Sequence, residues 1–128
     1  MLNRNVDCSP GDLGLSINSD RNVFTGQEGG SVSISCRFTE TYLTHSKYWC
    51  RGKASDTCWR LKTESTRSLN ERVSIVENTT LQIFTMTIRQ LERADSGWYW
   101  CAVDVPKKDL NIPFYLIVNP ANYDVDDD

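Results

Sequence analysis

Two cysteines and a tryptophan, far apart in the sequence, limit the folds open to this chain more than any other feature. Cys36 lies in the alternating segment SVSISCRF, Trp49 follows thirteen residues later, and Cys101 ends the segment DSGWYWC. Alternation of apolar and polar residues is the period of a strand buried on one side. The spacing therefore predicts three separate strands around one core, with a disulfide from Cys36 to Cys101 across it.

Short alternating segments account for most of the chain. Besides the segments around the two cysteines, strands are predicted in SKYWCR, WRLK, RVSIV, QIFTMTIRQL and NIPFYLIV, each bounded by turn residues. In QIFTMTIRQL, the residues at 84, 86 and 88 share the inward face, and Ile83 faces outward. No window predicts an amphipathic helix beyond a turn around residues 89–95. Seven or more short strands favour an all-β sandwich.

The residues around Cys101 identify the sandwich more closely. A cysteine, a tryptophan on the next strand, and a second cysteine two residues after a tyrosine form the signature of the immunoglobulin fold. Tyr99 fits the tyrosine corner, whose hydroxyl bonds the nearby backbone, and Asp95 is expected to form a bidentate ion pair with Arg72. The interval from Cys36 to Cys101 has room for C′ and C″ strands, which favours the variable type.

A second disulfide is predicted outside the core. If Trp49 faces the core, alternation turns Tyr48 and Cys50 outward onto the solvent face of the sheet, with Trp100 nearby. Cys50 and Cys58 would then close a small loop between the C and C′ strands. Such a bond stiffens the hairpin and gives the flanking loops a fixed geometry, which lowers the ordering cost of binding.

The two ends of the chain are predicted to lie outside the domain. Residues 1–16 read as a flexible leader, residues 17–120 as the domain, and the acidic residues 121–128 as a stalk or tail. The first 15 residues lack the apolar segment of a signal peptide, which indicates a mature or recombinant form if the protein is secreted. Cys8 has no partner in the pattern; a free thiol, a link between two chains and a recombinant end are the alternatives.

Composition argues against several function classes. The net charge of −3 and the scattered basic residues argue against a nucleic-acid partner. With one histidine, His45, no CxxC pair, and four cysteines committed to disulfides, neither a zinc site nor a catalytic arrangement can be assembled, so no enzyme is expected. Structural disulfides indicate an oxidising compartment, where the sequon at Asn78 is a candidate glycosylation site.

Several motifs together resemble one receptor family. They are GQEGGSVSISCRF, KYWCRG, the C-x7-C pair at Cys50 and Cys58, RVSI, and FTMTIRQLERADSG followed by YWC. These are similar to the leukocyte mono-immunoglobulin-like receptors of the CMRF-35 type and to the polymeric immunoglobulin receptor, over about residues 17–120. The triggering receptors on myeloid cells and the natural cytotoxicity receptors share the fold and a similar extra disulfide. The resemblance implies the extracellular domain of a single-pass type I protein of the plasma membrane.

The resemblance also implies where a ligand binds. Relatives of the mono-immunoglobulin group take phosphatidylserine, phosphatidylethanolamine or protein ligands between the B–C and F–G loops, which correspond here to residues 39–46 and 104–113. Tyr42 and Leu43 are the best contact candidates, because aromatic and apolar anchors carry much of the binding energy, whereas His45 is expected to be simply exposed. The full candidate set is Thr41, Tyr42, Leu43, His45, Asp104, Lys107, Lys108 and Asp109.

Three hypotheses follow for the function. The first is an innate immune receptor that binds a lipid headgroup or a protein through these loops; the second is an immunoglobulin-binding domain of a polymeric immunoglobulin transport receptor. The third is an adhesive module that uses its sheet face, with Trp98 and Trp100 partly exposed. Calcium holds phosphate in some relatives, but Asp104 and Asp109, with Glu40, offer few of the six to eight oxygens it takes. No cofactor is therefore expected. The final strand lacks the F-G-x-G bulge of paired variable domains, so the domain is expected to be monomeric.

Overall fold

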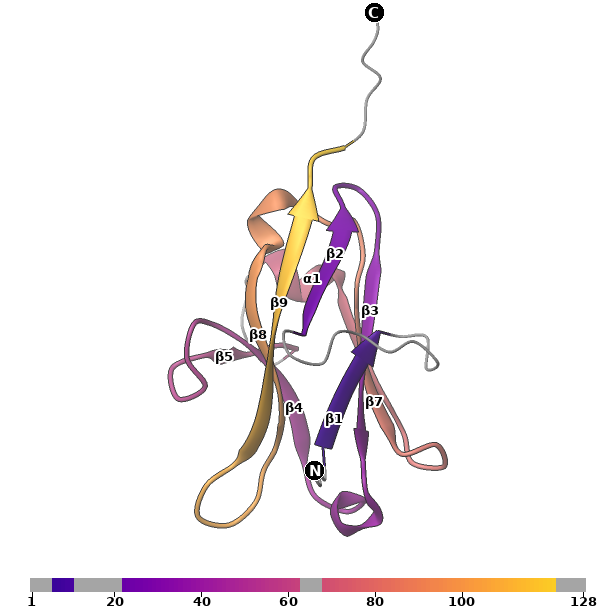
Figure 1. Cartoon of the computed structure of the whole chain (residues 1–128), viewed down its shortest axis with the longest axis vertical. Helices are drawn as coiled ribbons and strands as arrows, with labels where there is room; N and C mark the ends of the chain where they lie inside the picture. Colours follow the sequence, from indigo (N-terminus) through magenta and orange to yellow (C-terminus); the bar gives the residue numbers. More distant parts are fainter. Residues whose placement is uncertain (1–5, 11–21, 63–67, 122–128) are drawn as a thin grey trace, which may run out of the picture.

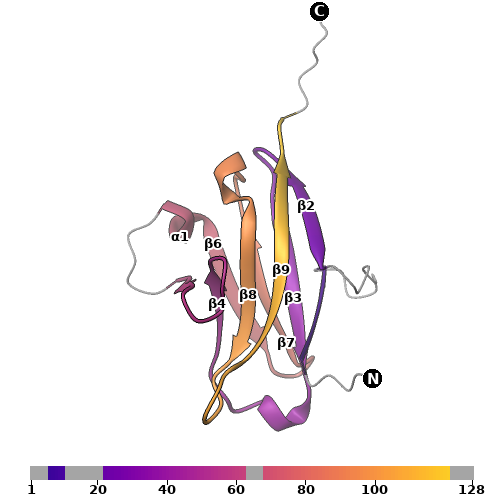
Figure 2. The same cartoon turned by 60° about the vertical axis from the view of Figure 1, so that its left-hand side comes forward.

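The strands are arranged in two sheets that face each other (Figures 1 and 2). The computed structural model describes residues 6–10, 22–62 and 68–121. Within these residues, one sheet has four strands, in the spatial order β1 (Val6–Pro10), β3 (Val32–Phe38), β7 (Ile83–Ile88) and β6 (Val73–Asn78). The other sheet has five, in the order β2 (Val23–Gln27), β9 (Leu110–Asn119), β8 (Gly97–Val103), β4 (Lys47–Arg51) and β5 (Trp59–Arg60).

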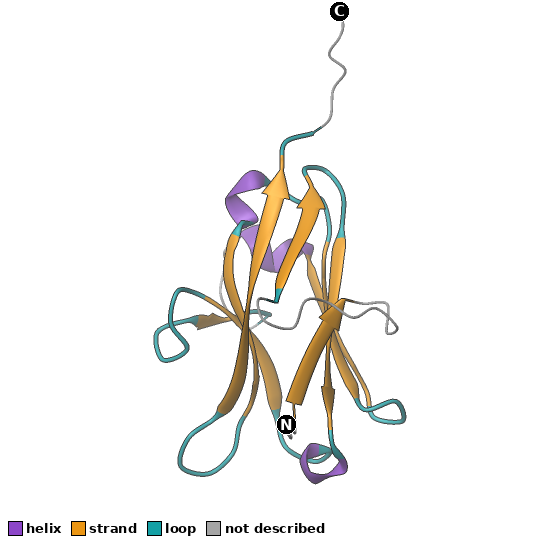
Figure 3. Ribbon diagram, in the orientation of Figure 1, coloured by secondary structure: helices purple, strands orange, loops and turns teal. Residues whose placement is uncertain are grey.

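In the described residues, three short helical segments connect the strands (Figure 3). They are η1 (Glu40–Tyr42), α1 (Ser68–Arg72) and η2 (Arg93–Asp95). The expected turn near residue 95 is η2, but α1 was not predicted. The predicted C″ strand is not found between β5 and β6 in the described part of the chain, where α1 precedes β6. No helix among the described residues combines the length and apolar character needed to cross a membrane.

The first strand differs from the flexible leader predicted for residues 1–16. Val6–Pro10 form β1, which pairs antiparallel with β3, so that Cys8 lies opposite Cys36 in the register. The prediction is wrong for these five residues because β3 offers a free edge, and backbone pairing needs no alternating side-chain pattern. The rest of the predicted leader and residues 122–128 of the predicted tail lie outside the described residues.

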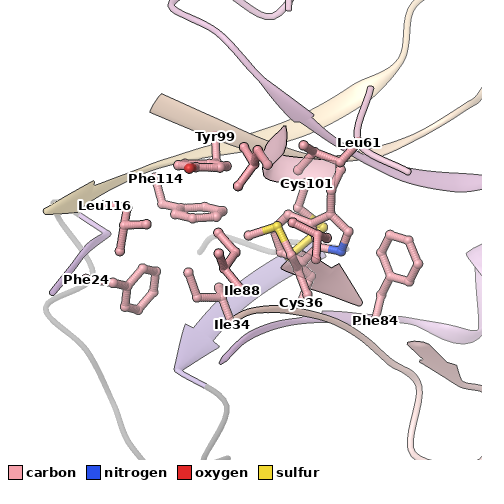
Figure 4. Packing of buried hydrophobic residues seen from close by; sticks show 14 of the residues in the cluster. Phe24, Ile34, Cys36, Leu61, Phe84, Ile88, Tyr99, Cys101, Phe114 and Leu116 are labelled. Atoms are coloured by element: carbon pink, nitrogen blue, oxygen red, sulfur yellow. A yellow bond between two sulfur atoms is a disulfide. The ribbon is translucent and has the colours of Figure 1, made fainter. Parts of the chain in front are cut away.

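The core is built around the predicted disulfide and tryptophan. Cys36 of β3 and Cys101 of β8 are bonded across the sheets (Figure 4), and Trp49 lies opposite Cys101 in the β4–β8 register. The Trp49 ring stacks on Phe84 at 5.8 Å and meets Phe114 edge-on at 5.5 Å between ring centroids. Trp49 is fully buried. The signature that predicted the sandwich is therefore confirmed, with an aromatic cluster packed around it.

The tyrosine corner and the predicted ion pair close one end of the sandwich. The Tyr99 hydroxyl donates to the carbonyl oxygen of Asp95 at 2.6 Å, and burial raises the pKa of Tyr99. Arg72 donates to both carboxylate oxygens of Asp95, at 2.8 and 2.9 Å, and this hydrogen bonding raises the pKa of Arg72. The predicted pair is therefore present, and it ties α1, which was not predicted, to η2.

The second disulfide is confirmed, but it is not on an open surface. Cys50 is bonded to Cys58 and faces away from the core, yet only 1% of Cys50 is exposed. Trp100 of β8 and Arg60 of β5 flank Cys50 in the sheet register, and the Trp100 Nε1–H donates to the carbonyl of Gly52 at 2.8 Å. Large neighbours on the adjacent strands thus bury the cysteine that alternation had placed on a solvent face.

Candidate functional site

Two loops meet at the end of the sandwich opposite the Arg72–Asp95 pair (Figure 1). The B–C loop, residues 39–46, connects β3 to β4, and the F–G loop, Asp104–Asp109, connects β8 to β9. The backbone N–H of Asp104 donates to the carbonyl of Ser46 at 2.9 Å, so the bases of the two loops are bonded directly. The F–G loop is shorter than predicted because β9 already begins at Leu110, which pairs with Val103.

Successive turns fold the B–C loop back on itself. The N–H of Tyr42 donates to the carbonyl of Thr39, that of Leu43 to Glu40, and that of His45 to Tyr42, at 3.0 to 3.2 Å. The rings of Tyr42 and His45 meet edge-on with centroids 5.4 Å apart. These three backbone hydrogen bonds and the ring contact hold the loop in a folded conformation, which lowers the entropy still to be lost on binding a ligand.

A buried lysine fastens the B–C loop to the sandwich. Only 1% of the Lys47 side chain is exposed, and its ammonium donates to the carbonyl oxygens of Leu43 at 3.3 Å and His45 at 3.0 Å. The same ammonium donates to the carboxylate of Glu77 on β6 at 2.7 Å and lies 5.2 Å from the centroid of the Phe38 ring. A buried charge needs such partners. Lys47 thus links the loop to both sheets.

The F–G loop ends in a tight turn that carries two cations. The N–H of Lys108 donates to the carbonyl of Pro106 at 2.9 Å, and Lys107 between them has a φ of 77°. A positive φ is uncommon for residues other than glycine. Lys107 and Lys108 are both exposed. The turn therefore presents two neighbouring ammonium groups to solvent.

A tyrosine and an arginine hold the far side of the F–G loop. The Tyr48 hydroxyl of β4 donates to the carboxylate of Asp109, at the end of the loop. The guanidinium carbon of Arg60 lies 3.6 Å from the centroid of the Tyr48 ring, a cation–π distance. Burial, followed by the hydrogen bond to Asp109, raises the pKa of Tyr48 to about 12. Tyr48 thus connects the F–G loop to β4 and β5.

Replacing Tyr48 by phenylalanine tests this connection through pH. The raised pKa favours the folded state while the phenol is protonated, so the contribution is complete below the ordinary tyrosine pKa of about 10 and is lost as the pH rises toward 12. We expect Tyr48→Phe to lower the free energy of unfolding by about 1–2 kcal/mol at neutral pH. Urea unfolding from about pH 9 to 11.5 should show this difference shrinking.

Comparing the two proteins at each pH removes the effect of Tyr99, whose pKa is also raised in both. A difference between wild type and Tyr48→Phe that stays constant across the range would contradict the assignment. Amide hydrogen exchange in the F–G loop offers a local readout, since exchange at residues 104–109 should accelerate in the variant while the B–C loop stays unchanged.

The predicted contact residues of the B–C loop are less available than expected. Tyr42 and Leu43 are half-buried, and Tyr42 packs against the core cluster. His45, predicted to be simply exposed, is half-buried; its Nδ1 atom is buried and makes no hydrogen bond within the described part of the chain. Thr41 is exposed. Tyr42, predicted to be a ligand contact, therefore also packs between the loop and the core, so that only part of its side chain is exposed.

The predicted F–G residues divide in the same way. Asp104, Lys107 and Lys108 are exposed, whereas Asp109 is half-buried and accepts the Tyr48 hydrogen bond. Among the described residues, no group of three or more histidine, cysteine or acidic side chains is placed to hold a metal ion. The loop end therefore offers exposed cations, with one of its two carboxylates engaged by the protein itself.

Apolar side chains also gather on the outer face of the second sheet. Val23, Tyr115 and Trp98 lie side by side across β2, β9 and β8, and Ile117 follows Tyr115 on the same face. Their exposed fractions are 41% for Val23, 39% for Trp98 and 37% for Ile117. The Trp98 and Tyr115 rings meet edge-on at 5.1 Å. We call these four residues the sheet-face patch.

Lys47 and Tyr48 were not predicted as residues that position the site. Lys47 is in phase with Trp49, so alternation alone turns it inward, and an inward lysine at a strand end requires a carboxylate or carbonyl partner. That signal was present in the sequence. The partner of Tyr48, Asp109, is 61 positions away, and no local pattern connects the two.

Comparison with known proteins agrees with this geometry. The profile of the Immunoglobulin V-set domain matches residues 19–114. CMRF35-like molecule 1 of Mus musculus is 38% identical over 98 residues, covering 74% of this chain and 28% of that protein. CMRF35-like molecule 7 of Homo sapiens is 35% identical over 97 residues, covering 73% of this chain and 48% of that protein. The chain thus spans less than half the length of these relatives.

A solved structure shows the same fold at low identity. The crystal structure of Dpr2 Ig1-Ig2 in complex with DIP-Theta Ig1-Ig3 matches with a TM-score of 0.65 and 22% identity, over 92% of this chain and 49% of that chain. The predicted variable-type sandwich, the resemblance to the CMRF-35 type and the expectation of a non-enzymatic domain are all confirmed by these matches. The chain belongs to the immunoglobulin V-set family, and the CMRF35-like molecules are its curated relatives.

Proposed function

We propose that this chain is the ligand-binding ectodomain of a cell-surface innate immune receptor, and that it binds a lipid headgroup or a protein ligand through its B–C and F–G loops. The observation that carries the proposal is the bonded pair of loops at one end of the sandwich. Asp104 joins the loops, while Lys47 and Tyr48 hold each of them from the sheet. Loops held in this way lose little further entropy when a ligand binds.

The charge at the loop tip favours an anionic ligand. Lys107 and Lys108 are exposed neighbours on a turn with a constrained backbone, while Asp109 is half-buried and its carboxylate accepts a hydrogen bond from Tyr48. An ammonium group near an anionic membrane contributes about 1 kcal/mol. β9 ends at the opposite end of the domain (Figure 1), so a membrane anchor that followed it would leave the loops pointing away from the cell that carries them.

Vesicle binding tests this proposal. Vesicles of phosphatidylcholine alone, or with phosphatidylserine or phosphatidylethanolamine, are mixed with the chain, with calcium or with a chelator. The Lys107→Ala/Lys108→Ala variant is expected to lose about 2 kcal/mol of binding to phosphatidylserine vesicles, which is about a thirtyfold loss of affinity. Lys53→Ala is the matched control, because Lys53 is also exposed but lies between Cys50 and Cys58, away from the loop end.

The outcomes separate the hypotheses. An equal effect of the loop and control variants would contradict binding through the F–G loop. Binding to polymeric immunoglobulin but to no vesicle would favour the transport-receptor alternative. If binding to vesicles required calcium, Asp104 would become a candidate metal ligand, and the expectation of no cofactor would be wrong.

The sheet-face patch favours a second candidate function, adhesion to another protein. Val23, Trp98 and Ile117 are among the most exposed large apolar side chains, and they are contiguous. Contiguous apolar surface of this kind often marks a protein interaction site. If Trp98→Ser weakens binding to cells while Lys107→Ala/Lys108→Ala leaves it unchanged, the adhesive function is favoured over loop recognition.

A further inference from the structure

A small apolar patch surrounds one asparagine on the outer face of the four-stranded sheet. Alternation on β6 turns Val73 inward and Val76 and Asn78 outward, and Asn78 lies opposite Ile83 of β7 in the register. Leu81 lies in the turn between these strands. Val76 is 61% exposed and Leu81 is 55% exposed, the two highest fractions among the large apolar side chains of the described residues.

The asparagine at the centre of this patch is oriented by its own turn. The Asn78 Oδ1 accepts a hydrogen bond from the N–H of Leu81 at 2.9 Å, while its Nδ2 has no hydrogen-bond partner within the described part of the chain. Asn78, Thr79 and Thr80 are all exposed. They form an N-x-T sequon, and it is the sole sequon in the whole sequence.

We propose that Asn78 carries an N-linked glycan whose first sugars cover Val76, Leu81 and Ile83. The donor is a polyprenyl-pyrophosphate-linked oligosaccharide of the secretory pathway. A bond forms between the Asn78 Nδ2 and the anomeric carbon as the bond from that carbon to the pyrophosphate oxygen breaks. Nδ2 gives up one proton, and the lipid pyrophosphate leaves with the electron pair. The apolar faces and acetyl groups of the first sugars then contact the three side chains.

The patch and the edge strand explain why a glycan belongs here. β6 is the edge strand of its sheet, and an exposed edge beside apolar side chains is prone to unwanted pairing. A bulky, hydrated glycan on the outer face of that strand hinders the approach of a second chain. The four residues of the sheet-face patch lie on the other sheet, so they stay open to protein partners.

The glycan also borders the candidate ligand loops. Glu77, the neighbour of Asn78, accepts the hydrogen bond from Lys47 that fastens the B–C loop, and the N–H of Phe38 donates to the carbonyl of Gln82 in the β6–β7 turn at 2.9 Å. The glycan therefore flanks the B–C loop on the β6 side. The turn with Lys107 and Lys108 is carried by the other sheet and remains accessible.

Secretion of the chain from animal cells tests the modification. Peptide mapping of wild type before and after amide-cleaving deglycosylation should show conversion of Asn78 to aspartate. The Asn78→Gln and Thr80→Ala variants should lose the glycan completely, whereas Thr80→Ser and the matched control Thr79→Ala should retain it. Unmodified Asn78 in secreted wild type would overturn the proposal, and so would a glycan that persists in Thr80→Ala.

Contact between the glycan and the patch needs its own measurement. In methyl-labelled protein trimmed to its first sugars, we expect nuclear Overhauser effects between the sugar acetyl methyls and the methyls of Val76, Leu81 or Ile83. The methyls of Val23 and Ile117 on the other sheet are the controls. A glycan with no effect at any of the three patch residues overturns the covering role. None of these readouts uses a ligand, so they succeed or fail independently of vesicle binding.

Discussion

Replacing Cys36 and Cys101 together by alanine is expected to lower the free energy of unfolding by about 4 kcal/mol. The two cysteines are separated by 65 positions, and in the chain-entropy model a cross-link over that interval removes about this much from the unfolded state. Both cysteines are fully buried, so the two deleted sulfur atoms also leave unfilled space in the core. A small domain has only about 5–15 kcal/mol in total.

The Cys50→Ala/Cys58→Ala variant is the matched control for this prediction. Its loop spans 8 positions, for which the same model gives about 2.5 kcal/mol. Urea unfolding of both variants beside wild type measures the difference, and the core pair should cost more. An equal or larger loss from the outer pair would mean that burial of Cys50, rather than the length of the closed loop, determines the stabilisation.

The cysteine and tryptophan spacing could be predicted because it follows from a geometric requirement of the fold. A bond between two sheets and a ring packed beside it need residues of fixed type on fixed strands, so the pattern survives in the sequence. Alternation of apolar and polar residues also predicted which side chains face the core. Ile34 and Phe38 of β3 and Met86 and Ile88 of β7 are all buried as expected. The ion pair between Arg72 and Asp95 could be predicted for the same reason, because the fold places an arginine and a carboxylate at fixed positions at one end of the sandwich.

Side-chain contacts across the sheet could not be predicted in the same way. The sequence predicted Trp100 near Cys50, and this is confirmed, but the second lateral neighbour, Arg60, was not predicted, because alternation along β4 does not say which residue of β5 lies opposite Cys50. The bond from Tyr48 to Asp109 spans 61 positions. The packing of Tyr42 in the B–C loop could not be predicted either. Its position in a polar segment indicated an exposed ligand contact, but its side chain packs against the core.

The start of the last strand, next to the site, could not be predicted from the sequence pattern either. The segment NIPFYLIV predicted the last strand correctly, but pairing with β8 extends it to Leu110 and shortens the F–G loop. This change matters for function because a shorter loop leaves Lys107 and Lys108 on a tight turn rather than on a long, freely moving segment. The two lysines could be named from the sequence, whereas their constrained presentation could not.

Breaking the Arg72–Asp95 pair is the second large effect that we expect. The side chains are 11% and 4% exposed, and both carboxylate oxygens of Asp95 accept hydrogen bonds from the guanidinium. Among the described residues, Arg72→Met would leave the buried Asp95 carboxylate with one hydrogen-bond partner, the backbone N–H of Glu92 at 2.8 Å. Removing one member of a buried pair costs about 3–5 kcal/mol, and we expect a loss in that range by urea unfolding.

A double-mutant cycle separates the pair from its parts. Because the Arg72→Met/Asp95→Asn double variant no longer buries an unpaired charge, its loss should be clearly smaller than the sum of the two single losses. A single loss below about 1 kcal/mol would instead make this an ordinary surface pair. The pair lies at the end opposite the ligand loops, so folded Arg72→Met should retain the vesicle binding of wild type. Loss of that binding in a folded variant would mean that the two ends of the sandwich are coupled.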